Sequence, residues 1–195
     1  MIFSTDSAFK IETKDVSYLE GGIHEDVSLV GVRQERSANG NLFLEFAFDK
    51  NGAQLTHTEY EPTKRADQST EELEAKANNQ VRRILQILQV WYTKEQLSSF
   101  SAESFDQFGK WVKGMLDATD KSKKVRLKVV YGNTGYTSLP KYAKYTFIES
   151  MEIPASESKV KDLKIDVFVR PEMGDVEQTT KSAAATFGAT SNSPF

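Results

Sequence analysis

The sequence predicts a mainly β protein: an antiparallel β-barrel that carries an insertion of two helices and is followed by a flexible C-terminal tail. Three observations predict this class. Strand-like alternation of apolar and polar residues occurs in two separate blocks, a stretch with helical periodicity lies between them, and the last part of the chain is poor in large apolar residues. Strands, then helices, then strands is the order expected of one barrel with a helical insertion.

The first block predicts a three-stranded meander after a lead-in. Residues 1–22 contain one short predicted strand, and the next strand begins within 27–32. Residues 42–48 form the clearest strand, because their apolar side chains share one face at period two. The Asn-Gly turn that follows tolerates the positive φ of a tight hairpin. Residues 55–60 are predicted to form the third strand.

The middle of the chain predicts the two helices. The Ser-x-x-Glu pattern at 69–72 fits a capping box, in which two side chains satisfy free backbone amides at the start of a helix. Apolar residues then recur at spacings of three and four over 73–91, one face of a helix of about five turns. A second helix is predicted to begin after Ser101 or Ser104. The helical insertion is expected over about 67–118.

The second block returns to sheet. Residues 125–131 alternate apolar with mostly basic side chains, and a turn follows at 132–135. Another strand is predicted over 145–153, and residues 165–169 are predicted to close the sheet. Together with the first block, these strands complete the predicted barrel.

The chain is long enough for one domain with a tail. Its 195 residues are 38% hydrophobic, which suffices for a buried core. We predict a domain over 1–171 and a flexible tail over 172–195. Ser, Thr, Ala and Gly dominate the tail, so little apolar surface is present there to offset the chain entropy lost on folding.

Several classes of protein and site are excluded by composition. The chain has no cysteine, which rules out disulfides, thiolate metal sites and a cysteine nucleophile. Its first residues lack the basic start and apolar run of a signal peptide, and no apolar run approaches the ~18 residues of a membrane span. We therefore expect a soluble, cytoplasmic protein with no membrane association.

Charge is distributed unevenly along the chain. Residues 121–170 hold eleven Lys or Arg against five acids, a net charge of +6, whereas residues 1–120 carry a net charge of −7. Tyrosines are interleaved with the basic residues of 121–170. Basic residues neutralise phosphates and aromatic rings stack on bases, so this segment is typical of a module that binds single-stranded nucleic acid.

The strand over 125–131 supplies the first candidate contacts. Period-two alternation sends Lys124, Arg126 and Lys128 to one face and the aliphatic residues to the other. We expect the basic face to be exposed and to contact phosphates. The alternative is a half-buried strand whose solvated face is basic without any ligand.

The loop after this strand supplies the rest. It holds four tyrosines and two lysines within fifteen residues, together with two glycines that allow the backbone to approach a ligand closely. The tyrosines could instead fill or cap the core. The candidate nucleic-acid-binding residues are Lys124, Arg126, Lys128, Tyr131, Tyr136, Lys141, Tyr142, Lys144 and Tyr145. The central expectation is that these charges and rings converge on one exposed channel.

Catalysis is not expected. His24 and His57 are distant from each other in the sequence and too few for a zinc or iron site, so structural or surface roles are favoured. Glu45, Glu59 and Glu61 could hold magnesium in a nuclease, but their spacing matches no catalytic motif. The phosphate-cradling Gly-x-x-x-x-Gly-Lys loop is missing. We predict no enzyme activity, no cofactor and no metal site.

Several segments resemble one family. The segments 21–29, 42–46, 57–62, 125–131 and 135–140 are similar to the single-stranded DNA-binding proteins that tailed bacteriophages encode. This resemblance implies an OB-type barrel that coats and protects single-stranded DNA during phage replication or recombination, in the host cytoplasm and without catalysis. Homo-oligomerisation is compatible with it.

The C-terminus extends the resemblance. Pro194 and Phe195 resemble the Pro-Phe end of bacterial single-stranded DNA-binding proteins, whose acidic tip docks on replication and repair partners. This chain departs from that pattern, because 189–193 holds no acid and the acids of the tail lie at or before residue 177. The resemblance implies recruitment of replication or recombination proteins, and the alternative is a solubilising tail. If residues 172–195 lie across the basic channel when DNA is absent, their deletion should tighten DNA binding at low salt, and unchanged affinity would show that the tail does not compete.

A virion structural or assembly protein is the alternative from another class. It would also explain a tail and a lack of catalytic motifs. The position of the gene, beside replication genes or beside capsid genes, would separate the two functions.

Overall fold

The computed structural model describes residues 17–171. The predicted tail over 172–195, including Pro194 and Phe195, lies outside the described residues, so the predictions for the tail are not tested by the structure.

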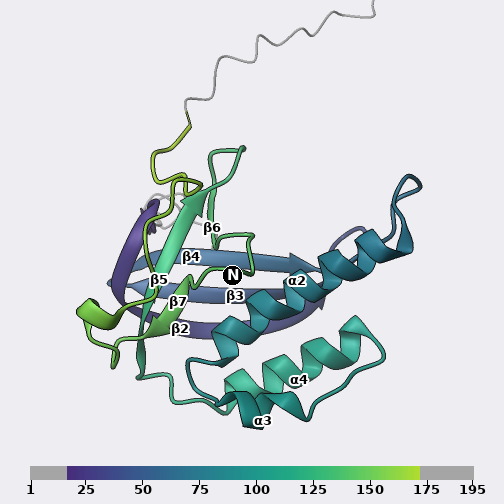
Figure 1. The fold of residues 1–195 in the computed structure, drawn as a ribbon, viewed down its shortest axis with the longest axis horizontal. Helices are drawn as coiled ribbons and strands as arrows, with labels where there is room; N and C mark the ends of the chain where they lie inside the picture. Colours follow the sequence, from purple (N-terminus) through teal and green to yellow (C-terminus); the bar gives the residue numbers. More distant parts are fainter. Residues whose placement is uncertain (1–16, 172–195) are drawn as a thin grey trace, which may run out of the picture.

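The described chain is a mainly β domain with three α-helices, which confirms the predicted fold class (Figure 1). The strands are β1 (Ser17–Tyr18), β2 (Gly22–Arg36), β3 (Leu42–Lys50), β4 (Ala53–Tyr60), β5 (Lys124–Tyr131), β6 (Thr137–Ser138) and β7 (Ile148–Ser150). The helices are α2 (Thr70–Leu88), α3 (Lys94–Ser98) and α4 (Phe105–Asp117), and a single 3₁₀ turn covers Ala155–Glu157.

The sheet curves into a nearly closed barrel, in line with an OB-like fold. The strands follow the order β1-β4-β3-β2-β5-β6, and β7 pairs with β5 beside this path. β2 is fifteen residues long and belongs to both halves, since it pairs with β5 through its first part and with β3 through its second. A register shift between His24 and Val27, with Asp26 at φ 59°, and a second between Leu29 and Gly31 give β2 its bend.

The hairpin between β3 and β4 forms as its sequence predicts. Asn51 and Gly52 both have positive φ, 53° and 90°, which is the backbone a two-residue hairpin turn requires. The pairing then runs without a break from Lys50 opposite Ala53 to Phe43 opposite Tyr60.

The helices begin where their capping residues are. Ser69 accepts from the backbone N–H of Glu72 while the Glu72 side chain accepts from the backbone of Ser69, so the predicted capping box is present at α2. Ser104 caps α4 in the simpler way, by accepting from the Gln107 N–H. The short helix α3 was not predicted, although Thr93 and Gln96 form a second capping box at its start.

The core lies between the barrel and the helices. Phe46 and Phe48 of β3 are fully buried together with Ile84 of α2 and Leu116 of α4. Each such side chain stabilises the fold by about 1.5–3 kcal/mol relative to full exposure. In Figure 1 the helices cover one side of the barrel and leave the opposite side, near β6, free of helices.

One strand prediction is wrong, and another is correct in place but too long. Residues 165–169 form no regular strand, although the Tyr131 N–H donates to the Val167 carbonyl at 2.8 Å. The strand predicted over 145–153 shortens to β7, three residues long. The apolar residues of 165–169 suggested a strand that closes the sheet, but Ile165, Val167 and Val169 are all exposed in this structure.

Candidate nucleic-acid interface

β5 is buried on both faces, which contradicts the expectation of an exposed basic face. Arg126 is only 4% exposed and Lys128 is 0% exposed. The reason is that β5 pairs with β2 on one edge and β7 on the other, while groups from residues 149–166 fold over the face that alternation assigned to solvent. Phosphate contacts by Arg126 and Lys128 are therefore not supported.

Arg126 is held by two carboxylates. Its Nη2 lies 3.0 Å from Glu25 Oε1, and its Nη1 donates to Glu149. Burial opposes the charged form of Glu149, but hydrogen bonds from Ser158, Lys159 and Arg126 outweigh it and lower the pKa of this carboxyl. The guanidinium therefore joins β7 to the bulge of β2 inside the protein.

Lys128 is held by a second buried cluster. Its Nζ lies 2.7 Å from Asp166 Oδ2 and 2.8 Å from the Tyr142 hydroxyl, and that hydroxyl donates to Asp166 Oδ1 at 2.9 Å. Burial and the bond to Asp166 raise the pKa of Tyr142, so its proton stays in place. Tyr142 is thus anchored by its hydroxyl and offers only part of its ring to solvent.

Lys124 is exposed but stands apart from the tyrosines. Its ammonium donates to Ser28 on β2, at the start of β5. Tyr131 is at the other end of β5, about 23 Å away at ~3.3 Å per residue. Lys124 therefore does not share a channel with the residues after β5.

The turn directly after β5 exposes the predicted Tyr136, whereas the predicted Tyr131 at the end of the strand is buried. The Gly132 N–H donates to the Tyr136 carbonyl at 2.8 Å, and Gly135 has φ 73°, so the chain reverses in a tight turn. Tyr131 is buried beneath this turn, whereas Tyr136 is 75% exposed.

Tyr136 lines a groove of about 470 Å³, here called the tyrosine groove. The groove lies at the side where β1 and β4 face β6 without a continuous ladder of hydrogen bonds. Tyr18 of β1, which is 66% exposed, and Arg170 line it as well. Leu55 and Tyr131 also contribute apolar lining. One acid, Glu20, is present.

A second groove of about 450 Å³, here called the lysine groove, adjoins the first. Both grooves are lined by Tyr131, and the turn at 132–136 lies between them. Lys141 and the exposed Ile165 line the lysine groove. Its one acid, Asp166, is already neutralised by the buried lysine of β5.

The remaining predicted residues lie beside the lysine groove. Tyr145 packs edge-on against Tyr142, with ring centroids 5.5 Å apart. Lys144 Nζ stands 5.4 Å from the centre of the Tyr145 ring, a cation–π contact. Tyr136, Lys141, Tyr142, Lys144 and Tyr145 thus follow one side of the barrel, while the other predicted residues do not.

Helix α2 positions the segment that carries these side chains. Arg83 Nη1 donates to the Lys141 carbonyl at 2.9 Å, and Gln86 donates to the carbonyls of Ala143 and Tyr145 at 3.2 Å each. The Gln86 side-chain oxygen accepts from the Phe147 N–H. Side chains of α2 therefore hold the backbone of this loop, in addition to the contacts that Tyr142 makes with Asp166 and Tyr145.

A buried polar cluster under this loop fixes Arg83 in turn. Glu59 accepts from Arg83 Nε and Nη2 at 2.8 Å each, from Gln80 at 3.0 Å and from His57 Nε2 at 3.1 Å. His57 Nδ1 accepts from the Leu139 N–H at 3.3 Å, so its Nε2 carries the proton. Burial would raise the pKa of Glu59, but the hydrogen bonds from His57 and Arg83 hold it at about 2.

Sequence reasoning missed two residues of the tyrosine groove. Tyr18 lay in the predicted lead-in, and Arg170 was counted only as part of the basic segment. The available signal was weak: Tyr18 lies in a lead-in for which one short strand was predicted without bounds, and Arg170 is the last basic residue before Pro171. Neither position in the sequence predicts that the two side chains line the same groove.

The acids weighed for a nuclease do not converge. Glu45 bonds Arg33, Glu59 belongs to the buried cluster, and Glu61 lies by a different groove between the helices. Within residues 17–171, no group of three or more His, Asp or Glu is placed to hold a metal ion. No helix in that part of the chain is both long enough and apolar enough to cross a membrane.

Comparisons of this chain with protein-family models, with curated proteins and with solved structures give no match.

Proposed function

We propose that this protein binds single-stranded DNA, with little sequence preference, through the tyrosine groove and the lysine groove beside it. The observation that carries the proposal is that two mostly exposed tyrosines, Tyr18 and Tyr136, line the same groove as Arg170. Single-strand binders combine stacking faces with cations that follow the backbone, and every base has a face that can stack.

The arrangement supports a path for the strand along one side of the barrel. The path begins at Tyr18 and Arg170, crosses the turn that carries Tyr136, and continues past Lys141 to Lys144. Arg83 and Gln86 of α2 hold the backbone of the segment that carries Lys141 and Lys144 before a ligand arrives, which reduces the ordering cost of binding there.

The expected affinity loss follows from the size of stacking energies. A base stacked on an aromatic ring contributes about 1–3 kcal/mol, so Tyr136→Ala should weaken binding about 5- to 150-fold. If Arg170, Lys141 and Lys144 each neutralise one phosphate, the logarithm of the binding constant should fall with the logarithm of salt concentration with a slope of about −2.

The test is fluorescence anisotropy of labelled oligo-dT, titrated with the full chain at several salt concentrations. Matched controls are Tyr60→Ala, which removes a half-exposed tyrosine at the end of β4, and Arg36→Ala, at the turn between β2 and β3. Both should bind like wild type.

Absence of binding at low salt would end the proposal. Equal losses from Tyr136→Ala and Tyr60→Ala would show that DNA, if bound, does not occupy the tyrosine groove. Thermal unfolding of each variant keeps a folding defect from being taken for a binding defect.

A further inference from the structure

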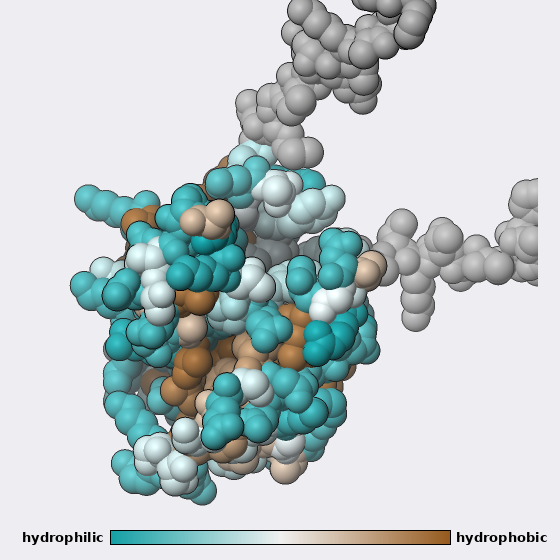
Figure 2. Space-filling model, turned by 90° about the vertical axis from the view of Figure 1, so that its right-hand side faces the viewer, coloured by the Kyte–Doolittle hydropathy of each residue, from teal (hydrophilic) through white to brown (hydrophobic). Residues whose placement is uncertain are grey.

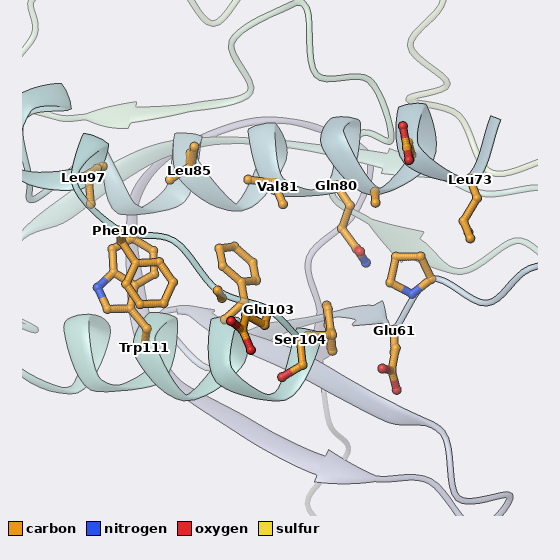
Figure 3. Close-up of a pocket in the computed structure, with 16 residues that line it drawn as sticks. Glu61, Leu73, Gln80, Val81, Leu85, Leu97, Phe100, Glu103, Ser104 and Trp111 are labelled. Atoms are coloured by element: carbon orange, nitrogen blue, oxygen red, sulfur yellow. The ribbon is translucent and has the colours of Figure 1, made fainter. Parts of the chain in front are cut away.

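A separate apolar groove lies between α2 and α4, on the other side of the molecule from β6 (Figures 1 and 3). It has a volume of about 610 Å³. Val81 and Leu85 of α2 face Trp111 of α4 across it, and Phe100 stacks on the Trp111 indole with ring centroids 4.1 Å apart. Figure 2 shows apolar surface gathered in a hollow on this face, bordered by hydrophilic residues.

The apolar residues of this groove are only partly covered by the protein itself. Leu73, Val81, Leu85, Phe105 and Trp111 are all intermediate in exposure. These side chains share one groove, unlike the isolated apolar residues that are normal on protein surfaces. A contiguous apolar hollow with a polar border is typical of a site for another protein.

The border of the groove is acidic. Glu61, Glu74 and Glu103 line it, and within residues 17–171 no Lys or Arg does so. The nearby lysines of α4 are engaged elsewhere: Lys110 pairs with Asp106, and Lys113 pairs with Asp117. An occupant therefore has to combine apolar anchors with positive charge.

From this geometry we infer that the groove between α2 and α4 binds a basic amphipathic helix of another protein. A helix lays its apolar stripe into such a groove with anchors at i, i+3, i+4 and i+7, and its Lys or Arg residues would face the three glutamates. α4 is thirteen residues long, about 20 Å, which matches a partner helix of roughly four turns.

Charge argues against occupants from this chain. Residues 1–16 carry a net charge of −1 and residues 172–195 a net charge of −2, so neither segment complements an acidic border. Two copies that paired through this groove would bring two acidic borders together, because a twofold interface uses the same patch on both subunits. A basic partner complements the acidic border and avoids the repulsion between two acidic surfaces.

The test uses two synthetic 14-residue peptides and the full chain without DNA. One peptide has leucines at i, i+3, i+4 and i+7 and lysines elsewhere, and the other replaces every lysine with glutamate. The protein variant carries Glu74→Lys and Glu103→Lys, both at exposed positions. The control variant carries Glu157→Lys and Asp162→Lys, exposed acids far along the chain.

The lysine peptide should bind wild type and the control variant equally. It should bind the variant with Glu74→Lys and Glu103→Lys, called the reversed variant, at least ~5-fold more weakly, because two charges at the border of the groove then repel the peptide instead of attracting it. The glutamate peptide should show the opposite preference. Anisotropy of the labelled peptides measures both, and thermal unfolding of the reversed variant checks its fold.

Three results would overturn the inference. The first is no binding of the lysine peptide to wild type. The second is equal loss in the reversed and control variants, which would indicate unspecific attraction to acidic surface. The third is evidence that the groove already has an occupant. That evidence would be tighter peptide binding after deletion of 1–16 or 172–195, or a wild-type dimer that is dissociated by Phe108→Glu, a substitution on α4 in the lining of the groove. DNA binding is not involved, so failure here leaves the proposed function untouched.

Discussion

Replacing Lys128 with methionine should destabilise the protein rather than remove a ligand contact. Its ammonium is fully buried and joined to Asp166 and Tyr142. Methionine matches the length of the apolar stem but leaves the Asp166 carboxylate, itself fully buried, without its counter-charge. Removing one partner of a buried ion pair costs about 3–5 kcal/mol, mainly because the other charge stays desolvated.

The size of this effect makes it easy to measure. In a domain of this length each kcal/mol changes the melting temperature by about 2–4 °C, so Lys128→Met should lower it by roughly 6–20 °C. The double variant Lys128→Met with Asp166→Asn removes both charges and should recover part of the loss. Lys144→Met, at an exposed position, should change stability by no more than about 0.5 kcal/mol.

Urea unfolding gives the free energies, and oligo-dT anisotropy at low temperature gives the affinity of the folded protein. Because Lys128→Met leaves the Asp166 carboxylate unneutralised in the lysine groove, DNA binding is compared for the double variant, which lacks both charges. We expect the folded double variant to bind DNA like wild type, and Lys144→Met to bind more weakly while remaining stable. The opposite pattern, a stable Lys128→Met and a double variant that has lost DNA binding, would refute the buried placement of this lysine and restore the exposed basic face of β5.

Two further predictions concern residues that hold the walls of the two grooves in place. The pKa of Glu59 is lowered from 4.5 to about 2, so the ionised carboxylate contributes roughly 3 kcal/mol of stability above pH 4.5, and this contribution is lost as the pH falls toward 2. The difference in unfolding free energy between wild type and Glu59→Gln should therefore narrow by about 2 kcal/mol from pH 6 to pH 3. A constant difference would contradict the lowered pKa of Glu59. At Gly21 an added Cβ would lie 2.6 Å from the Phe168 carbonyl oxygen, so Gly21→Ala should lower the unfolding free energy by about 1–3 kcal/mol because the chain before Arg170 has to move. Gly114 has open space around its Cβ position, so the control Gly114→Ala should not lower the unfolding free energy. Urea unfolding measures both variants.

Much of the local structure was predictable because its causes are local. The capping box at Ser69 and the Asn51–Gly52 turn each depend on residues within a few positions of one another, and both form as expected. α3 was missed although Thr93 starts a capping box, because five residues are too few for a periodic signal.

The candidate site was predictable only in part. The tyrosine-rich loop does place Tyr136, Lys141 and Lys144 at the surface. The alternation of basic and apolar residues in β5 indicated that Lys128 is exposed, and this prediction was wrong. Alternation shows that the two faces of a strand differ, but it does not show that either face is exposed to solvent.

The sequence by itself determined the order of the main strands and the two longer helices, the Asn51–Gly52 turn and the Ser69 cap, and the concentration of positive charge and tyrosine in one stretch. Only the tertiary structure decided which of those charges reach solvent. Arg126 pairs with Glu25, 101 residues earlier in the chain, and with Glu149, 23 residues later, and Lys128 pairs with Asp166, 38 residues later. The approach of these carboxylates depends on the chain folding back over β5, an arrangement that periodicity within the strand does not contain.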